Sequence, residues 1–372
     1  MRTLRHPVWF LAILLWGSPI WPQQSGVLLG IAGSSTSEGA DTQDFATIHE
    51  PQYQTLWIAR DADGKLKVLT TLPALVVPRR DGFWHVGVKQ LCDFQNNNER
   101  LRHVLWAAPV ARPAEIEQSV PCTAHNPEDY APPYGRTEAD MDKISQCGFE
   151  LINILYLSPE LISASTYTAQ SEACEPRGGR YSIDFSVRTF DTGEPADFGH
   201  LLGAKAHAAY ARALPKQGQN DAGGECAEPS APDDTGWRIA HQRGRWRPFL
   251  HLDLGFFGCA ADAPVAVALP ASLTGDSSVP PDWKLLQSKL PGVADLYSSP
   301  AGDLLIAQYK TQTKFFELRA GVPGKLLLTL PAAGIVMAQW ATGAHVHDWT
   351  EQLAGIAARP LPAPVIRVRT AP

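Results

Sequence analysis

Two histidines separated by a single residue could bind a metal ion in this chain. The segment AHVHDW contains His345 and His347, followed directly by Asp348. In a β-strand, residues two apart point to the same face, so both imidazoles could reach one zinc ion, with Asp348 or another residue as a further ligand. Zinc usually needs a third or fourth ligand, which the sequence does not identify. The alternative is a strand end with two ordinary histidines before a capped helix.

A second candidate site combines aromatic rings with guanidinium groups. The segment WRIAHQRGRWRPFLH predicts a hairpin that turns at Arg243 and Gly244. Tryptophan and arginine together can stack on sugars or bind acidic groups. Alternation places three arginines on one face of the strand, which is equally typical of a solvated face. The candidate binding residues are Trp237, Arg243, Arg245, Trp246 and Arg247.

The local signatures of common enzymes are missing from the sequence. It contains no G-x-S-x-G, H-E-x-x-H, P-loop or G-x-G-x-x-G motif. This favours binding over catalysis, and no cofactor is expected. A catalytic site assembled from distant loops remains the alternative, as in a hydrolase that acts on envelope polymers with a metal ion at His345 and His347.

The cysteines predict disulfides. The chain has six, each at least 25 residues from the next, so no C-x-x-C motif is present. An even count in an oxidising compartment favours disulfides, and free buried thiols are the alternative. Six cysteines allow about 15 connectivities, and short loop closure is the only reason to favour neighbours in sequence. The expected pairs are Cys92 with Cys122, Cys147 with Cys174, and Cys226 with Cys259.

The first residues predict export. Arg2 and Arg5 precede an apolar run from Val8 to Trp16, which is nine residues long and too short to span a bilayer. We therefore interpret residues 1–24 as a signal peptide, with a buried helix as the alternative, and expect a periplasmic or extracellular protein without a membrane span after cleavage. The net charge of −6 argues against nucleic acid as a partner.

Composition indicates many short strands joined by turns, because 31 prolines and 30 glycines accompany few charged residues. The predicted fold class is β-rich and mainly antiparallel, with an α+β middle part, arranged as a propeller-like or split β domain. Two stretches without periodicity divide the chain, and the last β segment is expected to pack with the first. The predicted parts are a β segment at 25–107, a linker at 108–135, an α+β domain at 136–214, a linker at 215–236 and a β segment at 237–372.

Periodicity within these parts predicts particular elements. The strongest strand is RYSIDFSVRTF, in which Tyr181, Ile183, Phe185 and Val187 alternate with polar residues. Helices are expected after Thr137, over 197–214 with Asp197 as cap, over 283–290, and over 349–359 with Asp348 as cap.

A similar phrase occurs near both ends of the chain. GKLKVLTTLPALVV at 64–77 resembles GKLLLTLPAAGIV at 324–336, with a two-residue gap between the two copies. Each reads as a strand, a Leu-Pro turn and a second strand. In a propeller or split domain the chain ends must meet, and equivalent strand pairs would result from such closure. Chance recurrence of short apolar strands is the alternative.

Two segments carry resemblances to known families. LYSSPAGDLLIAQY at 296–309 resembles the repeat of TolB-type β-propellers, with Ser299, Pro300, Ala301 and Gly302 at the turn and no acidic residue in its usual place. Within 161–203, ISASTYTAQ, SIDFSVRTFDTGEP and LLG resemble the extracytoplasmic domain found beside bacterial polysaccharide deacetylases and in lysozyme-sensing anti-sigma factors. The second resemblance implies an envelope protein and carries over no catalytic residue. We therefore expect an exported bacterial envelope protein that binds a protein or glycan; a purely structural role is a further alternative.

Overall fold

The computed structural model describes residues 24–33, 51–95, 98–118, 148–170, 180–190, 193–213, 236–253, 260–274 and 282–368. The predicted signal peptide and the predicted helix after Thr137 lie outside these residues. The predicted disulfides also lie outside them, because only the backbone of Cys92 is described. None of the helices in the described part is long and apolar enough to cross a membrane.

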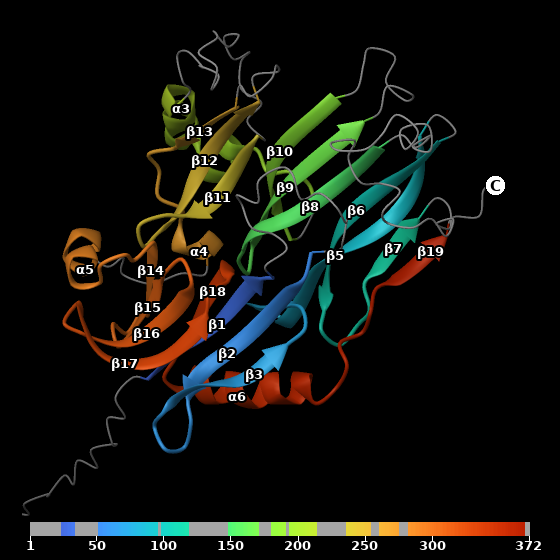
Figure 1. Cartoon of the computed structure of the whole chain (residues 1–372). Helices are drawn as coiled ribbons and strands as arrows, with labels where there is room; N and C mark the ends of the chain where they lie inside the picture. The colour runs from blue at the N-terminus through green and yellow to red at the C-terminus, as the bar shows by residue number, and fades with distance from the viewer. Residues whose placement is uncertain are drawn as a thin grey trace, which may run out of the picture.

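The protein is mostly β, and its antiparallel sheets form a four-bladed propeller-like arrangement, which confirms the predicted fold class (Figure 1). The first sheet has the order β18 (Gly334–Thr342), β1 (Ser25–Ala32), β2 (Tyr53–Arg60), β3 (Leu66–Leu72). The second has the order β10 (Arg180–Thr189), β9 (Leu161–Gln170), β8 (Gly148–Leu157), β6 (Asn98–Pro109), β5 (Gly82–Gln95), β4 (Leu75–Arg79).

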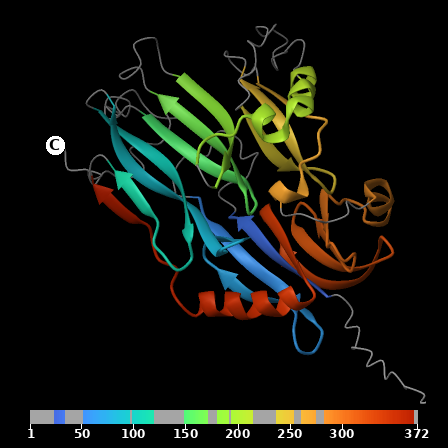
Figure 2. The same ribbon diagram turned by 180° about the vertical axis from the view of Figure 1, so that it is seen from behind.

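Two smaller sheets complete the ring, and a strand pair and several helices lie around it (Figures 1 and 2). The third sheet contains β11 (Trp237–His241), β12 (Trp246–Asp253) and β13 (Ala260–Pro264), and the fourth contains β14 (Asp295–Ser298), β15 (Leu304–Gln308), β16 (Gln312–Arg319) and β17 (Val322–Pro331). The parallel pair is β7 (Glu115–Gln118) with β19 (Val365–Val368). The described helices are α2 (Phe198–Leu202), α3 (Ala204–Ala213), α4 (Ala271–Thr274), α5 (Trp283–Lys289) and α6 (Ala344–Ala357).

The first sheet joins a strand from near the start of the sequence to one from its last quarter. Strand β1 pairs antiparallel with β18 on one side and with β2 on the other. Its apolar run is buried on both faces, since Val27 and Leu29 enter one hydrophobic core and Leu28 enters another. A continuous apolar strand is therefore explained by a position between two cores.

The phrase shared by 64–77 and 324–336 marks equivalent crossings between sheets. The first copy leads from β3, at the edge of one sheet, to β4, at the edge of the next. The second copy leads from β17 to β18, which are also edge strands of successive sheets. Both copies therefore carry the chain from one blade to the next.

The short helix α4 cross-links the sheets around it. The Thr274 carbonyl accepts a hydrogen bond from Gln339 Nε2 of β18 at 3.1 Å, and the Leu273 carbonyl accepts one from Ser158 Oγ, beyond the end of β8, at 2.7 Å. The two donors belong to different blades. Buried carbonyl groups at the end of a short helix need such partners, and here they join the blades.

Several element boundaries differ from the prediction. The helix predicted over 197–214 is two helices, because Gly203 with φ 85° interrupts it; the Asp197 cap is confirmed by His200 N donating to its Oδ1 at 2.6 Å. The helix predicted over 349–359 begins earlier, at Ala344. The strand over 181–187 is confirmed, but Ile183 is 45% exposed.

Candidate functional site

The structure separates the tryptophans and arginines of the β11–β12 hairpin. Its turn is at Arg243 and Gly244, as predicted. Trp237 is fully buried and donates its Nε1 hydrogen to the Ala196 carbonyl at 2.8 Å, and Trp246 is 7% exposed. Arg243 and Arg245 are exposed and Arg247 is half-buried. The two indoles belong to the core, so they form no common surface with the guanidinium groups.

The same hairpin is joined to the fourth sheet by a buried carboxylate. Asp295 Oδ2 lies 2.7 Å from His241 Nδ1, and Asp295 Oδ1 accepts the Gly244 N–H at 2.8 Å. The His241 ring stacks on Tyr297 at 3.8 Å between centroids. Burial, assisted by the charge of Asp295, raises the pKa of the Tyr297 hydroxyl well above its ordinary value. The cluster connects two blades.

His345 and His347 lie on helix α6 and not on a strand, so the geometry assumed for the metal site is wrong. Residues two apart on a helix are about 200° apart around its axis. Each imidazole is 75% exposed and lies near an acid of its own helix, His345 at 3.6 Å from Asp348 and His347 at 3.2 Å from Glu351. Within the described ranges, no group of three His, Cys, Asp or Glu residues could hold a metal ion.

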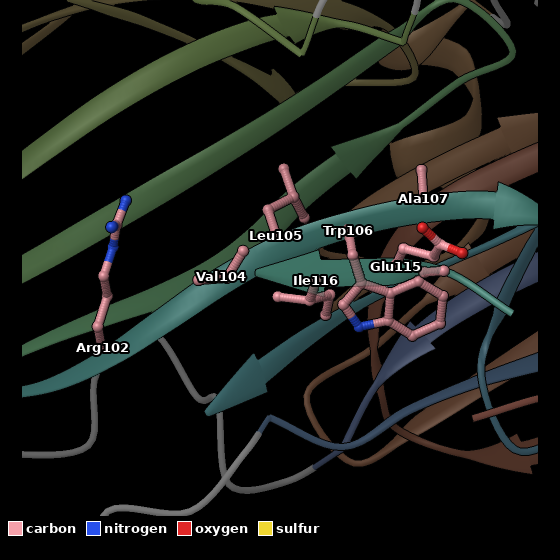
Figure 3. Close-up of a pocket in the computed structure, with 8 residues that line it drawn as sticks. Arg102, Val104, Leu105, Trp106, Ala107, Glu115 and Ile116 are labelled. Atoms are coloured by element: carbon pink, nitrogen blue, oxygen red, sulfur yellow. The ribbon is translucent and has the colours of Figure 1, made fainter. Parts of the chain in front are cut away.

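A groove beside β6 and β7 is the candidate site that the structure itself presents. Its volume is about 390 Å³, within the range of small-ligand pockets. Figure 3 shows Trp106 on one side of β6, with Leu105 and Ala107 on the other. The lining residues are Arg102, Val104, Leu105, Trp106, Ala107, Ala114, Glu115 and Ile116. We call this site the β6 groove.

Trp106 is the largest side chain of the β6 groove. Its ring meets His85 of β5 edge-on at 4.8 Å, and it lies so close to Gly87 that a Cβ there would be 2.7 Å from the indole. Its Nε1 is buried and has no hydrogen-bond partner among the described residues. A buried donor without a partner weakens the fold by about 1–3 kcal/mol, and an acceptor on a ligand would recover this energy.

His85 fixes one end of the groove. It is 1% exposed, and its Nε2 lies 3.1 Å from the carbonyl oxygen of Arg112, in the turn that leads to β7. Burial lowers the pKa of the His85 imidazole, while the contact with the Arg112 carbonyl opposes this shift. A neutral imidazole that faces a carbonyl must carry its proton on Nε2. His85 therefore donates to Arg112 and holds the turn in place.

Two charged side chains stand at the ends of the β6 groove. Arg102 Nε lies 4.0 Å from Glu150 Oε1, which is a loose ion pair. Glu115 is paired with Arg367 of the C-terminal strand β19 at 2.6 Å, and the Val365 N–H donates to the Ala114 carbonyl at 2.7 Å. The C-terminal strand thus supports the β7 wall of the groove.

Sequence reasoning did not find this site. It assigned Ala114, Glu115 and Ile116 to a linker, whereas Glu115–Gln118 forms β7. Trp106 lies in an apolar run, LRHVLWAAP, that reads as an ordinary buried strand. The one signal for the site is that Gly87 pairs with Trp106, and this becomes visible only when the register of β5 and β6 is known.

The fold and the groove together define a propeller-like β protein with an open site on the side of one blade. Comparison of the chain with models of known protein families and with curated proteins finds no match.

Proposed function

We propose that this is an exported bacterial envelope protein that binds a protein or glycan at the β6 groove and does not catalyse a reaction. The observation that carries this proposal is Trp106, which lines the groove together with Arg102 and Glu115 and whose buried Nε1 has no partner among the described residues. An indole offers both an apolar ring and a donor, and such residues dominate binding sites.

The proposed export and envelope location rest on the basic and apolar N-terminus, with the six cysteines paired as disulfides. The resemblance to TolB-type repeats gains support from the turn between β14 and β15. Its acid is Asp303, directly after Gly302, and Asp303 accepts hydrogen bonds from Ser299 Oγ at 2.7 Å and from Ser25 N at 3.0 Å. The resemblance of 161–203 to an extracytoplasmic domain points to the same compartment.

Binding by immobilised protein tests this function, with soluble peptidoglycan fragments and detergent-extracted envelope proteins as probes. Trp106→Phe removes the indole N–H and should reduce retention about tenfold, the value of one hydrogen bond of about 1.4 kcal/mol. Trp84→Phe is the matched control, because the Trp84 indole donates to Asp81 at an exposed position outside the groove.

A second variant displaces the indole without changing a lining residue. In Gly87→Ala the new methyl group would meet the Trp106 ring at 2.7 Å and push it into the groove, so retention should fall. Gly355→Ala, on α6, places its methyl group where nothing lies within 4 Å and should leave retention unchanged. The proposed function is wrong if the wild type retains neither probe. It is also wrong if the Trp106→Phe and Gly87→Ala variants retain the probes as well as the wild type does.

A further inference from the structure

We propose that the ligand of the β6 groove is the carboxyl-terminal end of an extended peptide, which adds as a strand to the open edge of β6. This inference rests on the proposed function and names the ligand class. Peptides commonly bind in this way to sheet edges, where backbone hydrogen bonds provide affinity and neighbouring pockets provide specificity.

The edge of β6 is open because β6 and β8 separate. Strand β6 pairs with β5 along its whole length, but with β8 only at Leu101 and Arg102. Beyond that point side chains bind the backbone of β8: Ile152 N donates to His103 Nδ1 at 3.2 Å, and Ile154 N donates to the Tyr53 hydroxyl at 2.7 Å. From residue 103 onward, no described strand pairs with this edge of β6.

The register shows which backbone groups point to the open edge. Val110 N donates to the Phe83 carbonyl at 3.0 Å. In an antiparallel pair, hydrogen-bonded and non-hydrogen-bonded positions alternate, so Ala108 and Trp106 bond to β5. Leu105 and Ala107 then direct their N–H and C=O groups away from β5. Both residues line the groove, which a peptide backbone could therefore enter as a new strand.

The charge of Arg102 sets the direction of the peptide. Figure 3 shows Arg102 and Glu115 toward opposite ends of this stretch of β6. A strand antiparallel to β6 would bring its carboxyl end to Arg102, whose planar guanidinium suits a carboxylate. Five strand steps from Arg102 to Ala107 span about 17 Å, so about five residues would fit.

Two pools of random pentapeptides test this inference, one with free carboxyl ends and one with carboxyl-terminal amides. Peptides retained by the immobilised full-length protein are quantified by mass spectrometry. The free-acid pool should be retained about tenfold better than the amide pool, because the amide removes a charge-assisted hydrogen bond. Arg102→Gln should abolish this preference. Arg80→Gln is the matched control, since Arg80 is 93% exposed and does not line the groove, and should preserve it.

The outcomes separate this inference from the proposed function. Equal retention of the two pools, no retention of either, or a preference that survives Arg102→Gln overturns the peptide assignment. If a tetramer of N-acetylglucosamine binds instead, and Trp106→Phe weakens that binding, the binding function stands with a glycan as its ligand. Peptides N-methylated at alternate residues should be retained less than unmodified ones; unchanged retention also overturns strand addition.

Discussion

At the scale of single residues, the β6 groove depends on three residues that contact one another, Gly87, Trp106 and His85. Gly87 allows the Trp106 ring to approach the sheet, and His85 meets that ring edge-on while holding the turn before β7. A side chain larger than hydrogen at 87, or a charged ring at 85, would move the indole. The groove is therefore sensitive to changes that leave its lining residues intact.

The buried His85 predicts a dependence of stability on pH. The pKa of His85 is about 6.5 in the unfolded protein and lower in the folded protein. When the pH falls below about 6.5, the unfolded chain therefore binds more protons than the folded one. The free energy of unfolding should therefore fall as the pH drops below about 6.5, by at most about 1.4 kcal/mol per pH unit from this residue. His85→Gln keeps a donor and does not titrate. Urea unfolding between pH 7.5 and 5 should show a shallower decline in this variant, and identical slopes would contradict the assignment.

At the scale of elements, the β11–β12 hairpin shows how buried polar groups position a blade. Its turn is held by Asp295 at the start of β14, through His241 and the Gly244 N–H. Sequence reasoning predicted the hairpin from local turn chemistry, but attributed its tryptophans to binding. Both indoles belong to the hydrophobic core because neighbouring blades cover them. The local sequence pattern does not show this burial.

Replacing Asp295 should weaken this connection strongly. Asp295→Ala leaves the Gly244 and Leu296 N–H groups buried without an acceptor, at about 1–3 kcal/mol each. We expect the free energy of unfolding in urea to fall by about 3 kcal/mol. Asp184→Ala, at an exposed position of β10, should change it by less than about 0.5 kcal/mol. Equal effects of the two changes would show that Asp295 does not join the blades.

The sequence of helix α6 contains a helical spacing of apolar residues that the strand prediction did not use. Val346, Trp349, Leu353 and Ile356 all pack in one hydrophobic core, and their spacings of three, four and three residues are helical. The strand prediction used only the alternation of His345 and His347. A longer window would have placed both histidines on a helix and removed the basis of the metal site.

At the scale of the whole molecule, the sequence predicted the β-rich class. The similarity of 64–77 and 324–336 suggested a propeller-like or split domain, and the arrangement is propeller-like. The position of the β6 groove could not be predicted in the same way. It depends on the divergence of β6 from β8 and on β7 lying beside Trp106, and both follow from contacts between segments far apart in the chain. Local patterns specify strands, whereas the gaps between them are set by packing.

Two truncations test the closure of the ring. Ending the chain after Ala333 removes β18, α6 and β19 and leaves β1 with one partner strand, so we expect loss of cooperative unfolding, measured by circular dichroism in urea. Ending it after Ala358 removes only β19 and its pairing with β7, so cooperative unfolding should persist while the β6 groove loses the support of Arg367. A cooperative transition at an unchanged midpoint in the shorter chain would show that closure by β18 is unnecessary.

The pairing of β1 with β18 also has a consequence for the order of folding. Ser25 and Thr342 are partners in the same ladder although they lie at opposite ends of the chain. During synthesis one edge of β1 stays unpaired until residues 334–342 of β18 have been made. Contacts of such long sequence separation slow folding and prolong the exposure of aggregation-prone strands. The first sheet can therefore be completed only after β18 has been synthesised.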